Sequence, residues 1–483
     1  MSTSEPKSWT TSRDLLLELP PDRRRRAGIE DAIRSAVRSG RLPAGARLPS
    51  TRALAHDLGV SRGTIVDVYA QLAAEGWISG RTGSGTTIAT GALQHVPVDA
   101  MRPRPQTRWR FDFRPGRPDA TSFPRSEWLR ALRRALATAP SDAFGYDSTP
   151  GLAALRVELA EYLGRARGLR VGADDILVTT GFTQSLALLS RFLGRPARVA
   201  MEMPSMSLHR AIVRAAGNEV VPIGVDDDGL RVDELLDTRE VAMLVLTPNR
   251  QHPTGALLSP ARRSAVMAWA RRCGAVVVED DYDGEFRYDR RPIGPLQSLD
   301  PDLVIHAGTV AKTLSPGVRL GWLVLPRRHR SAVTRQKELA DWQTGVLNQL
   351  AFAELLRQGR YDRHVRRMRL AYRRRRDALL DALRARVPAA RTEGEAAGLN
   401  LVLPVSSATV EASLIAAARR AGIALDGLIT GSYYETAGRP GVLIGYAAAP
   451  EHAFVRGLEA LVEVLASALG PAPVNGPGRN RSR

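Results

Sequence analysis

The stretch Gly308-Thr-Val-Ala-Lys-Thr-Leu-Ser-Pro-Gly-Val-Arg-Leu-Gly-Trp322 places one lysine, Lys312, in a turn between two apolar runs. Residues 303–307 and 320–325 have the composition of buried strands, so the turn between them would hold Lys312 on a rigid scaffold. A lysine that is partly removed from water can form a Schiff base with an aldehyde cofactor. On spacing alone, a surface lysine in a polar loop is an equally good interpretation.

The same stretch carries groups suited to a phosphate. Arg319 follows Lys312, and Thr309 and Ser315 add hydroxyls. A guanidinium fork matches two phosphate oxygens at once, which favours arginine in such sites.

Around this stretch, short apolar runs alternate with helical segments. The runs at residues 176–178, 198–201, 243–246 and 275–278 are typical of strands buried on both faces of a doubly wound α/β sheet. Ligands of such sheets bind where the carboxyl ends of the strands meet the following loops. At one such end, Thr179-Thr-Gly-Phe-Thr-Gln184 opens a helix, whose free amides at Phe182 and Thr183 can bind phosphate. At another, Glu279-Asp-Asp-Tyr-Asp283 could be a magnesium site, but without a phosphate-binding P-loop we expect no metal.

The N-terminal part predicts a DNA-binding unit. Ile29, Ile33 and Val37 follow the spacing of an amphipathic helix over residues 23–39. A second helix would end at Gly59 and a third would begin after the capping residue Ser61. Residues 77–88 then alternate apolar and polar side chains around a Gly-Ser-Gly turn, as in a two-stranded wing. A helix-turn-helix with a wing favours DNA over the alternative, a helical hairpin for protein contact.

Length and composition narrow the class of protein. The 483 residues suffice for two or three domains, and a formal net charge of +19 favours an acidic partner such as nucleic acid. The arginine-rich segment 360–386 has helical spacing, and we interpret it as a solvated helix face rather than a second DNA site. The single cysteine, Cys273, excludes an internal disulfide and is expected to be a buried thiol. No run is long enough to span a membrane and the first residues lack a signal-peptide core, so we expect a cytoplasmic protein.

Several motifs, in order, resemble a known family. Leu48-Pro-Ser-Thr-Arg52, Leu58-Gly-Val-Ser-Arg62 and Glu75-Gly-Trp77 resemble the GntR-type winged helix, and the Lys312 stretch resembles the cofactor-lysine motif of fold-type I pyridoxal 5′-phosphate (PLP) aminotransferases. The combination is similar to the MocR/GabR-like transcription regulators, and the resemblance extends from about residue 22 to about residue 450. It implies an α/β chain with a winged helix-turn-helix over 12–90 and an aminotransferase-like region with large and small domains over 110–470. The loss of periodicity over 91–109 predicts a linker, and the composition of the end of the chain predicts a disordered tail over 471–483.

The resemblance also implies roles for particular residues. Those expected to face DNA are Arg52, Ser61, Arg62, Gly63 and Thr64, with Arg81, Thr82 and Gly83 at the wing tip. Lys312 would carry PLP as an internal aldimine, Asp280 would face the ring nitrogen with Asp281 as its rival, and Tyr282 would face the ring hydroxyl. The phosphate would be held by Arg319, Thr309, Phe182 and Thr183.

Departures from the aminotransferase pattern accompany these matches. In Asn249-Arg-Gln-His-Pro-Thr-Gly255, His252 stands where aminotransferases have an asparagine, and Met206 stands where an aromatic ring usually stacks on the cofactor. Residues 441–446 lack the arginine that often grips a substrate carboxylate, which leaves Arg439, Arg210 or His209 as candidates. Tyr146 would reach the phosphate of a partner subunit in a homodimer, with an ordinary core aromatic as the alternative.

The leading hypothesis is a homodimeric regulator of operator DNA, in which an amino compound forms an external aldimine at Lys312 and thereby alters DNA binding. The alternatives are an active PLP-dependent aminotransferase that kept a DNA-binding domain, and a DNA-binding protein with a cofactor-free large domain. Any enzymatic activity would be PLP-dependent transamination.

Overall fold

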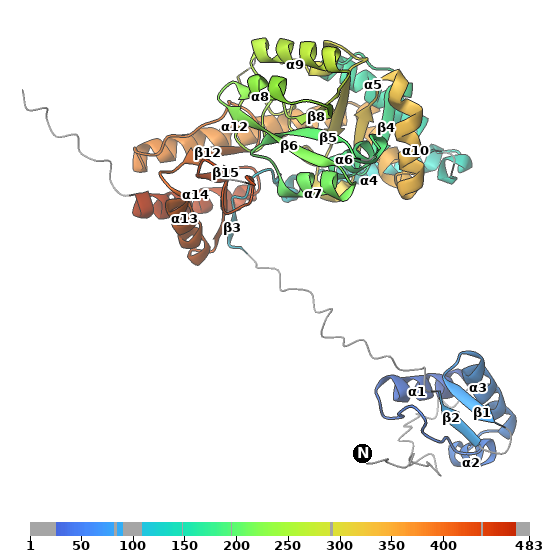
Figure 1. Cartoon of the computed structure of the whole chain (residues 1–483). Coiled ribbons are helices and arrows are strands. Elements are labelled where there is room, and N and C mark those ends of the chain that lie inside the picture. Colours follow the sequence, from blue (N-terminus) through green and yellow to red (C-terminus); the bar gives the residue numbers. More distant parts are fainter. Residues whose placement is uncertain are drawn as a thin grey trace, which may run out of the picture. The chain divides into compact units, whose positions relative to one another are not determined.

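The structure is a computed structural model that describes residues 26–81, 85–89, 109–146, 148–194, 196–289, 293–435 and 438–469. It divides into two compact units, residues 1–107 and 108–483 (Figure 1). The predicted tail, the wing residues Thr82 and Gly83, and the predicted linker apart from Trp109 lie outside the described residues. In the part of the chain described, no helix combines the length and apolarity that a membrane span requires.

The described part of the N-terminal unit contains three helices and a two-stranded sheet: α1 (Arg26–Arg38), α2 (Thr51–Leu58), α3 (Arg62–Ala74), β1 (Ile78–Arg81) and β2 (Gly85–Ile88). The predicted apolar stripe of α1 is completely buried, and it packs with the inward face of α3 in one core. Helix α2 ends at Gly59, whose φ of 65° is in the left-handed region that glycine adopts without strain. The winged helix-turn-helix predicted from the sequence is therefore confirmed.

The larger unit is built on an eight-stranded sheet. Its strand order is β4-β11-β10-β9-β8-β5-β6-β7. The bounds are β4 (Ile176–Thr179), β5 (Arg198–Met203), β6 (Glu219–Asp226), β7 (Gly229–Leu230), β8 (Val241–Leu246), β9 (Val276–Asp281), β10 (Val304–Thr309) and β11 (Gly321–Val324). Neighbouring strands are parallel except where β11 or β7 takes part. The carboxyl ends of β4, β10, β9, β8 and β5 consequently meet at one edge.

Helices cover both faces of this sheet (Figure 1). They are α4 (Arg125–Thr138), α5 (Ala153–Arg167), α6 (Phe182–Phe192), α7 (Ser207–Ala215), α8 (Val232–Asp237), α9 (Pro260–Cys273), α10 (Arg330–Asp341) and α11 (Val346–Arg357). The antiparallel return from β10 to β11 contains Lys312, and Thr309 pairs with Gly321 at its base. Gly308 is required there because a Cβ atom would lie 2.4 Å from the indole of Trp322. The apolar runs that flank the lysine are thus paired strands, as predicted.

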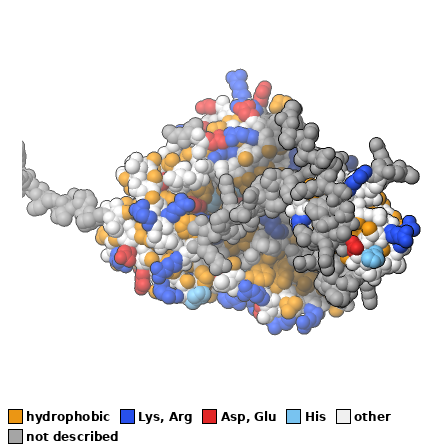
Figure 2. Space-filling view, turned by 90° about the horizontal axis from the view of Figure 1, so that it is seen from below, with side chains coloured by type: hydrophobic (Ala, Val, Ile, Leu, Met, Phe, Trp, Pro, Cys, Tyr) orange, Lys and Arg blue, Asp and Glu red, His pale blue; other side chains and the backbone are white. Residues whose placement is uncertain are grey.

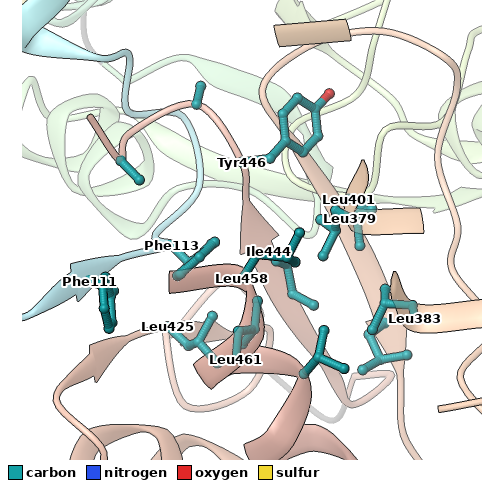
Figure 3. Close-up of a cluster of buried hydrophobic side chains, with 14 of the residues drawn as sticks. Phe111, Phe113, Leu379, Leu383, Leu401, Leu425, Ile444, Tyr446, Leu458 and Leu461 are labelled. Carbon is teal, nitrogen blue, oxygen red and sulfur yellow. The ribbon is translucent and has the colours of Figure 1, made fainter. Parts of the chain in front are cut away.

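A smaller sheet follows the long helix α12 (Arg360–Arg386). Its order is β12-β15-β14, with bounds β12 (Asn400–Pro404), β15 (Gly441–Gly445) and β14 (Asp426–Gly427). Helices α13 (Ala408–Arg420) and α14 (Glu451–Leu469) pack beside it, and β13 (Ile423–Ala424) pairs with β3 (Phe111–Asp112) from the start of the unit. Figure 3 shows the shared core, in which Phe113 lies near Ile444 and Leu458, and Phe111 belongs to the same buried cluster. This region is the predicted small domain.

The arginines of α12 and the side chain of Cys273 can be compared with what the sequence predicted. Helix α12 buries one face and turns most of its arginines outward, as expected, but Arg375 is buried and pairs with Asp119 at 3.0 Å. Lys and Arg side chains lie at several separate places on the face shown in Figure 2. The expectation of a buried Cys273 is wrong, because this residue ends α9 outside the buried face of that helix and is exposed.

Candidate cofactor site and nucleic-acid interface

A cavity of about 240 Å³ lies at the sheet edge where the carboxyl ends of the strands meet. Nine of the ten side chains that the sequence nominated for the cofactor line it: Phe182, Thr183, Met206, His252, Asp280, Tyr282, Thr309, Lys312 and Arg319. They come from five separate segments, so the fold gathers residues that lie up to 137 positions apart, from Phe182 to Arg319.

Lys312 reaches this cavity from the return between β10 and β11. Its Nζ donates a hydrogen bond to the backbone oxygen of Gly116 at 2.7 Å. Burial lowers the pKa of Lys312, although the carboxyls of Asp280 and Asp283 oppose this shift. The chain has only two other lysines. Lys337 is fully buried and paired with Asp341 at 2.7 Å, and Lys7 lies outside the described residues, which leaves Lys312 as the described lysine facing the cavity.

The two aspartates that end β9 point to opposite sides, as alternation along a strand requires. Asp280 lines the cavity, burial raises its pKa well above the ordinary value, and its Oδ1 has no hydrogen-bond partner among the described residues. Asp281 accepts two hydrogen bonds from Arg167, the shorter at 2.5 Å. Burial alone would raise the pKa of Asp281, but the Arg167 guanidinium holds it below the ordinary value. Of the two rivals, Asp280 is therefore the one available to a ligand.

Tyr282 and His252 form the next part of the lining. Their rings meet edge to face, with centroids 5.5 Å apart. Burial lowers the pKa of His252 well below its ordinary value, so this imidazole is neutral near pH 7. The hydroxyl of Tyr282 accepts a hydrogen bond of 2.9 Å from Arg250.

Arg250 is a residue that sequence reasoning missed. Its side chain is 2% exposed, pairs with Asp283 at 3.3 Å and donates to the backbone oxygen of Asn400 at 2.5 Å. Because Asn400 begins β12, this guanidinium connects the cavity wall to the small domain. The feature of the sequence that could have pointed to Arg250 is its position inside the Asn249–Gly255 segment. A sequence does not show, however, whether an arginine is buried.

The other end of the cavity is suited to an anion. Gly181, with φ of 118°, precedes α6, so the amides of Phe182 and Thr183 begin a helix without intrahelical partners. Arg319 lies nearby in a left-handed conformation, with φ of 52°. The hydroxyl of Thr309 donates to Leu320 at 3.2 Å and also faces the cavity. Backbone amides, a hydroxyl and a guanidinium together have the chemistry of a phosphate site.

Glu202 is a second residue that the sequence gave no reason to select. It is the next-to-last residue of the apolar strand β5, lines the cavity and is 5% exposed. Burial raises its pKa to about 7, although Thr247 donates to its carboxylate from both the backbone amide and the hydroxyl.

Three nominated residues are not brought into this cavity. Tyr146 is 77% exposed and meets Trp342 edge to face at 6.3 Å, which excludes the alternative of a core aromatic. Arg210 is buried and donates to backbone oxygens of Ser432 and Tyr433 at 2.8 and 3.0 Å. Arg439 lines a different, polar cavity, where it pairs with Glu393.

Four of the nominated DNA-contacting residues lie at the start of α3, and Arg52 lies in the first turn of α2. The Ser61 hydroxyl caps this helix by accepting a hydrogen bond of 3.1 Å from the Thr64 amide. Arg52, Arg62 and Gly63 are exposed. An exposed helix N-terminus with arginine beside it can approach phosphates and base edges in a major groove. Of the wing residues, Arg81 ends β1, and its side chain lies outside the described part.

Comparison with known proteins agrees with this geometry. Residues 117–461 match the family described as aminotransferase class I and II, and residues 25–88 match the bacterial regulatory proteins of the gntR family. The α-aminoadipate aminotransferase LysN of Thermus thermophilus, solved with N-(5′-phosphopyridoxyl)-L-leucine, superposes with a TM-score of 0.67 at 28% identity, covering 74% of this chain and 92% of that one. The larger unit is therefore a fold-type I aminotransferase domain, and the family indicates pyridoxal 5′-phosphate as the cofactor.

Similar regulators define the family more closely. The HTH-type pyridoxine biosynthesis transcriptional regulator PdxR of Corynebacterium glutamicum is 35% identical over 362 residues, which cover 74% of this chain and 78% of the relative. The probable rhizopine catabolism regulatory protein MocR of Rhizobium meliloti is 31% identical over 461 residues, or 90% of this chain and 92% of the relative. The chain belongs to the MocR/GabR-type transcription regulators, whose GntR-type helix-turn-helix implies DNA binding.

Proposed function

We propose that this protein is a PLP-dependent regulator that binds operator DNA through α3 and senses an amino compound at Lys312. The observation that carries the proposal is the pairing, in one cavity, of a partly desolvated lysine with a buried aspartate whose Oδ1 has no described partner. We further propose that it acts in the cytoplasm as a homodimer, in which the exposed Tyr146 contacts the partner.

The residues of the cavity fit the cofactor. Bound PLP supplies an aldehyde that condenses with primary amines and a ring that accepts electrons. Lys312 would be its covalent attachment, Asp280 would face the ring nitrogen and Tyr282 the ring hydroxyl. Arg319, Thr309 and the amides that begin α6 would hold the phosphate. Asp280 would thereby gain the hydrogen-bond partner that its buried Oδ1 lacks.

A sensing mechanism requires that the amino compound prefer one arrangement of the protein over another. Arg250 supports such coupling, because it contacts both Tyr282 in the cavity wall and Asn400 in the small domain. A ligand that moves Tyr282 would therefore disturb a buried contact between the two domains.

The visible absorption spectrum of the PLP-treated protein tests the cofactor site. We expect a cofactor–lysine band in the wild type that is absent from Lys312→Ala, and a shift of that band with the amino compound that is sensed. Lys312→Ala should retain basal operator affinity, since α3 belongs to a separate unit. A band that persists in Lys312→Ala would contradict the assignment.

A gel-shift titration tests the interface. Arg62→Ala should weaken specific operator binding by about 1–3 kcal/mol without altering the cofactor band. Arg374→Ala, an exposed arginine of α12, is the matched control. Equal operator affinities for the wild type and Arg62→Ala would refute the placement of the recognition helix.

Transamination is the second candidate function. It is favoured by the same observation, since the cavity holds the lysine, aspartate and tyrosine that proton transfer on a PLP-bound amine requires. Formation of a keto acid from an amino donor over many turnovers would support the enzyme; a spectral shift without product would support the sensor.

A further inference from the structure

An amino acid at Lys312 would present a carboxylate as well as an amine, and a carboxylate needs a cation with free hydrogen-bond donors. The three groups nominated from the sequence do not provide one. Arg210 has its guanidinium bound to Ser205, Ser432, Tyr433 and Glu435. Arg439 pairs with Glu393 away from the cavity. Burial lowers the pKa of His209 to about 4, which leaves that ring uncharged near pH 7.

A different arginine, Arg117, follows the residue whose backbone contacts Lys312. The chain leaves β3 and turns at Gly116, whose backbone oxygen accepts the hydrogen bond from Lys312 Nζ. Gly116 has φ of 66°, and a Cβ atom there would lie 3.4 Å from Lys312 Nζ and 3.8 Å from His252 Cε1. The backbone therefore passes directly against the cavity at this point, and the next residue is Arg117.

The guanidinium of Arg117 is available. Its side chain is 52% exposed, and it forms an ion pair with Asp112 at 3.6 Å, a distance too long for a hydrogen bond. Asp112 is already occupied, because Arg114 donates to both of its oxygens at 2.9 and 2.6 Å. No described residue thus accepts a hydrogen bond from the Arg117 side chain.

The charge of Arg117 also acts on Lys312. Burial is the main reason that the pKa of Lys312 is lowered, and the positive charge of Arg117 adds to this effect. His209 and His252 also interact with Lys312, but both rings are neutral near pH 7, so the repulsion that acts on Lys312 comes from Arg117. An anion bound between the two would relieve the repulsion.

We infer that Arg117 binds the carboxylate of the amino ligand, and that the protein therefore senses an amino acid or another amino carboxylate rather than a simple amine. This inference rests on the proposed function, in which Lys312 carries the cofactor. It assigns Arg117 a role in ligand selectivity and none in cofactor binding.

Matched ligands test the inference. The PLP-loaded protein would be titrated with alanine and ethylamine, with phenylalanine and phenethylamine, and with ε-aminocaproate and pentylamine, and the shift of the cofactor band followed. Each pair differs by one carboxylate. In the wild type we expect the acid of at least one pair to bind about tenfold or more tightly than its amine, the effect of a charge-assisted hydrogen bond.

Variants then locate the anchor. Arg117→Gln should lose about tenfold in affinity for the preferred acid and leave the affinity for the paired amine unchanged. Arg117→Lys keeps the positive charge but loses the two-pronged guanidinium. Its affinity for the preferred acid should therefore lie between those of the wild type and Arg117→Gln. Arg439→Gln, the matched control in the neighbouring cavity, should behave as the wild type.

Three results would overturn the inference: no preference for the acid in any pair, a preference that survives in Arg117→Gln, or a preference lost in Arg439→Gln. Each presupposes a cofactor band in the wild type. Absence of the band would instead contradict the proposed function, so the two failures are distinguishable.

Discussion

Glu202→Gln should make the stability of the cofactor-free protein less dependent on pH. Glu202 is 5% exposed in the cavity wall, and burial raises its pKa from 4.5 to about 7. The folded protein binds the proton of the Glu202 carboxyl more tightly than the unfolded chain does. The stability that this proton contributes is therefore fully present below pH 4.5 and is lost as the pH rises through 7. Such a shift corresponds to about 3 kcal/mol.

The glutamine keeps the hydrogen bonds and removes the ionisation. Its side-chain oxygen can still accept from the Thr247 amide and hydroxyl, which now lie 2.9 and 2.6 Å from the carboxylate. At pH 4.5 the wild type and the variant should therefore have similar free energies of unfolding. At pH 8 the variant should be more stable by up to about 3 kcal/mol.

Urea unfolding followed by tryptophan fluorescence at pH 4.5, 6 and 8 measures this difference. Glu459→Gln, at an exposed position of α14, controls for the loss of one negative charge. The reasoning would be refuted if Glu202→Gln and the wild type lost stability in parallel between pH 4.5 and pH 8. In that case, ionisation of the buried Glu202 carboxyl would not destabilise the folded protein.

Three further substitutions test the packing. Ser61→Ala should destabilise the winged-helix unit by about 1 kcal/mol, measured by hydrogen exchange of the α3 amides, since it removes the cap of α3; Ser61→Asn should restore it. Gly151→Ala should lower the thermal midpoint of the larger unit, because its φ is 101° and the new methyl would lie 2.3 Å from the Val178 side chain. Arg375→Met should lower the free energy of unfolding by about 3–5 kcal/mol in urea titrations, since it leaves Asp119 buried without its cation, and Asp119→Asn should recover part of the loss.

Arg250 offers a physical account of how a ligand could be sensed. It is buried, it bonds the Tyr282 hydroxyl, and it holds the first residue of β12. Gly398 packs so closely on this guanidinium that a Cβ atom there would lie 2.4 Å from Arg250 Nε. Because the contact is this tight, a displacement of the Arg250 side chain would have to move the backbone around Gly398 with it.

Much of the fold follows from local sequence. The apolar stripe of α1, the cap at Ser61 and the glycine after α2 depend on residues within one or two turns, so their pattern predicts the winged helix without knowledge of the rest of the chain. The strands on either side of Lys312 are similarly evident, because a strand buried on both faces needs a continuous apolar run. Family resemblance then nominated nine residues that line one cavity.

What the sequence by itself determined is therefore the order of the elements, the lysine between two strands and the class of protein. The tertiary structure alone decided which charged groups are free. Arg210 is occupied by residues more than 220 positions away and Asp281 by Arg167 at a separation of 114, whereas Arg117 forms an ion pair with Asp112 at 3.6 Å and donates no hydrogen bond to a described residue. The physical reason is that hydrogen-bond donors and acceptors are consumed by whatever the fold brings within about 3 Å, and no local pattern records those partners.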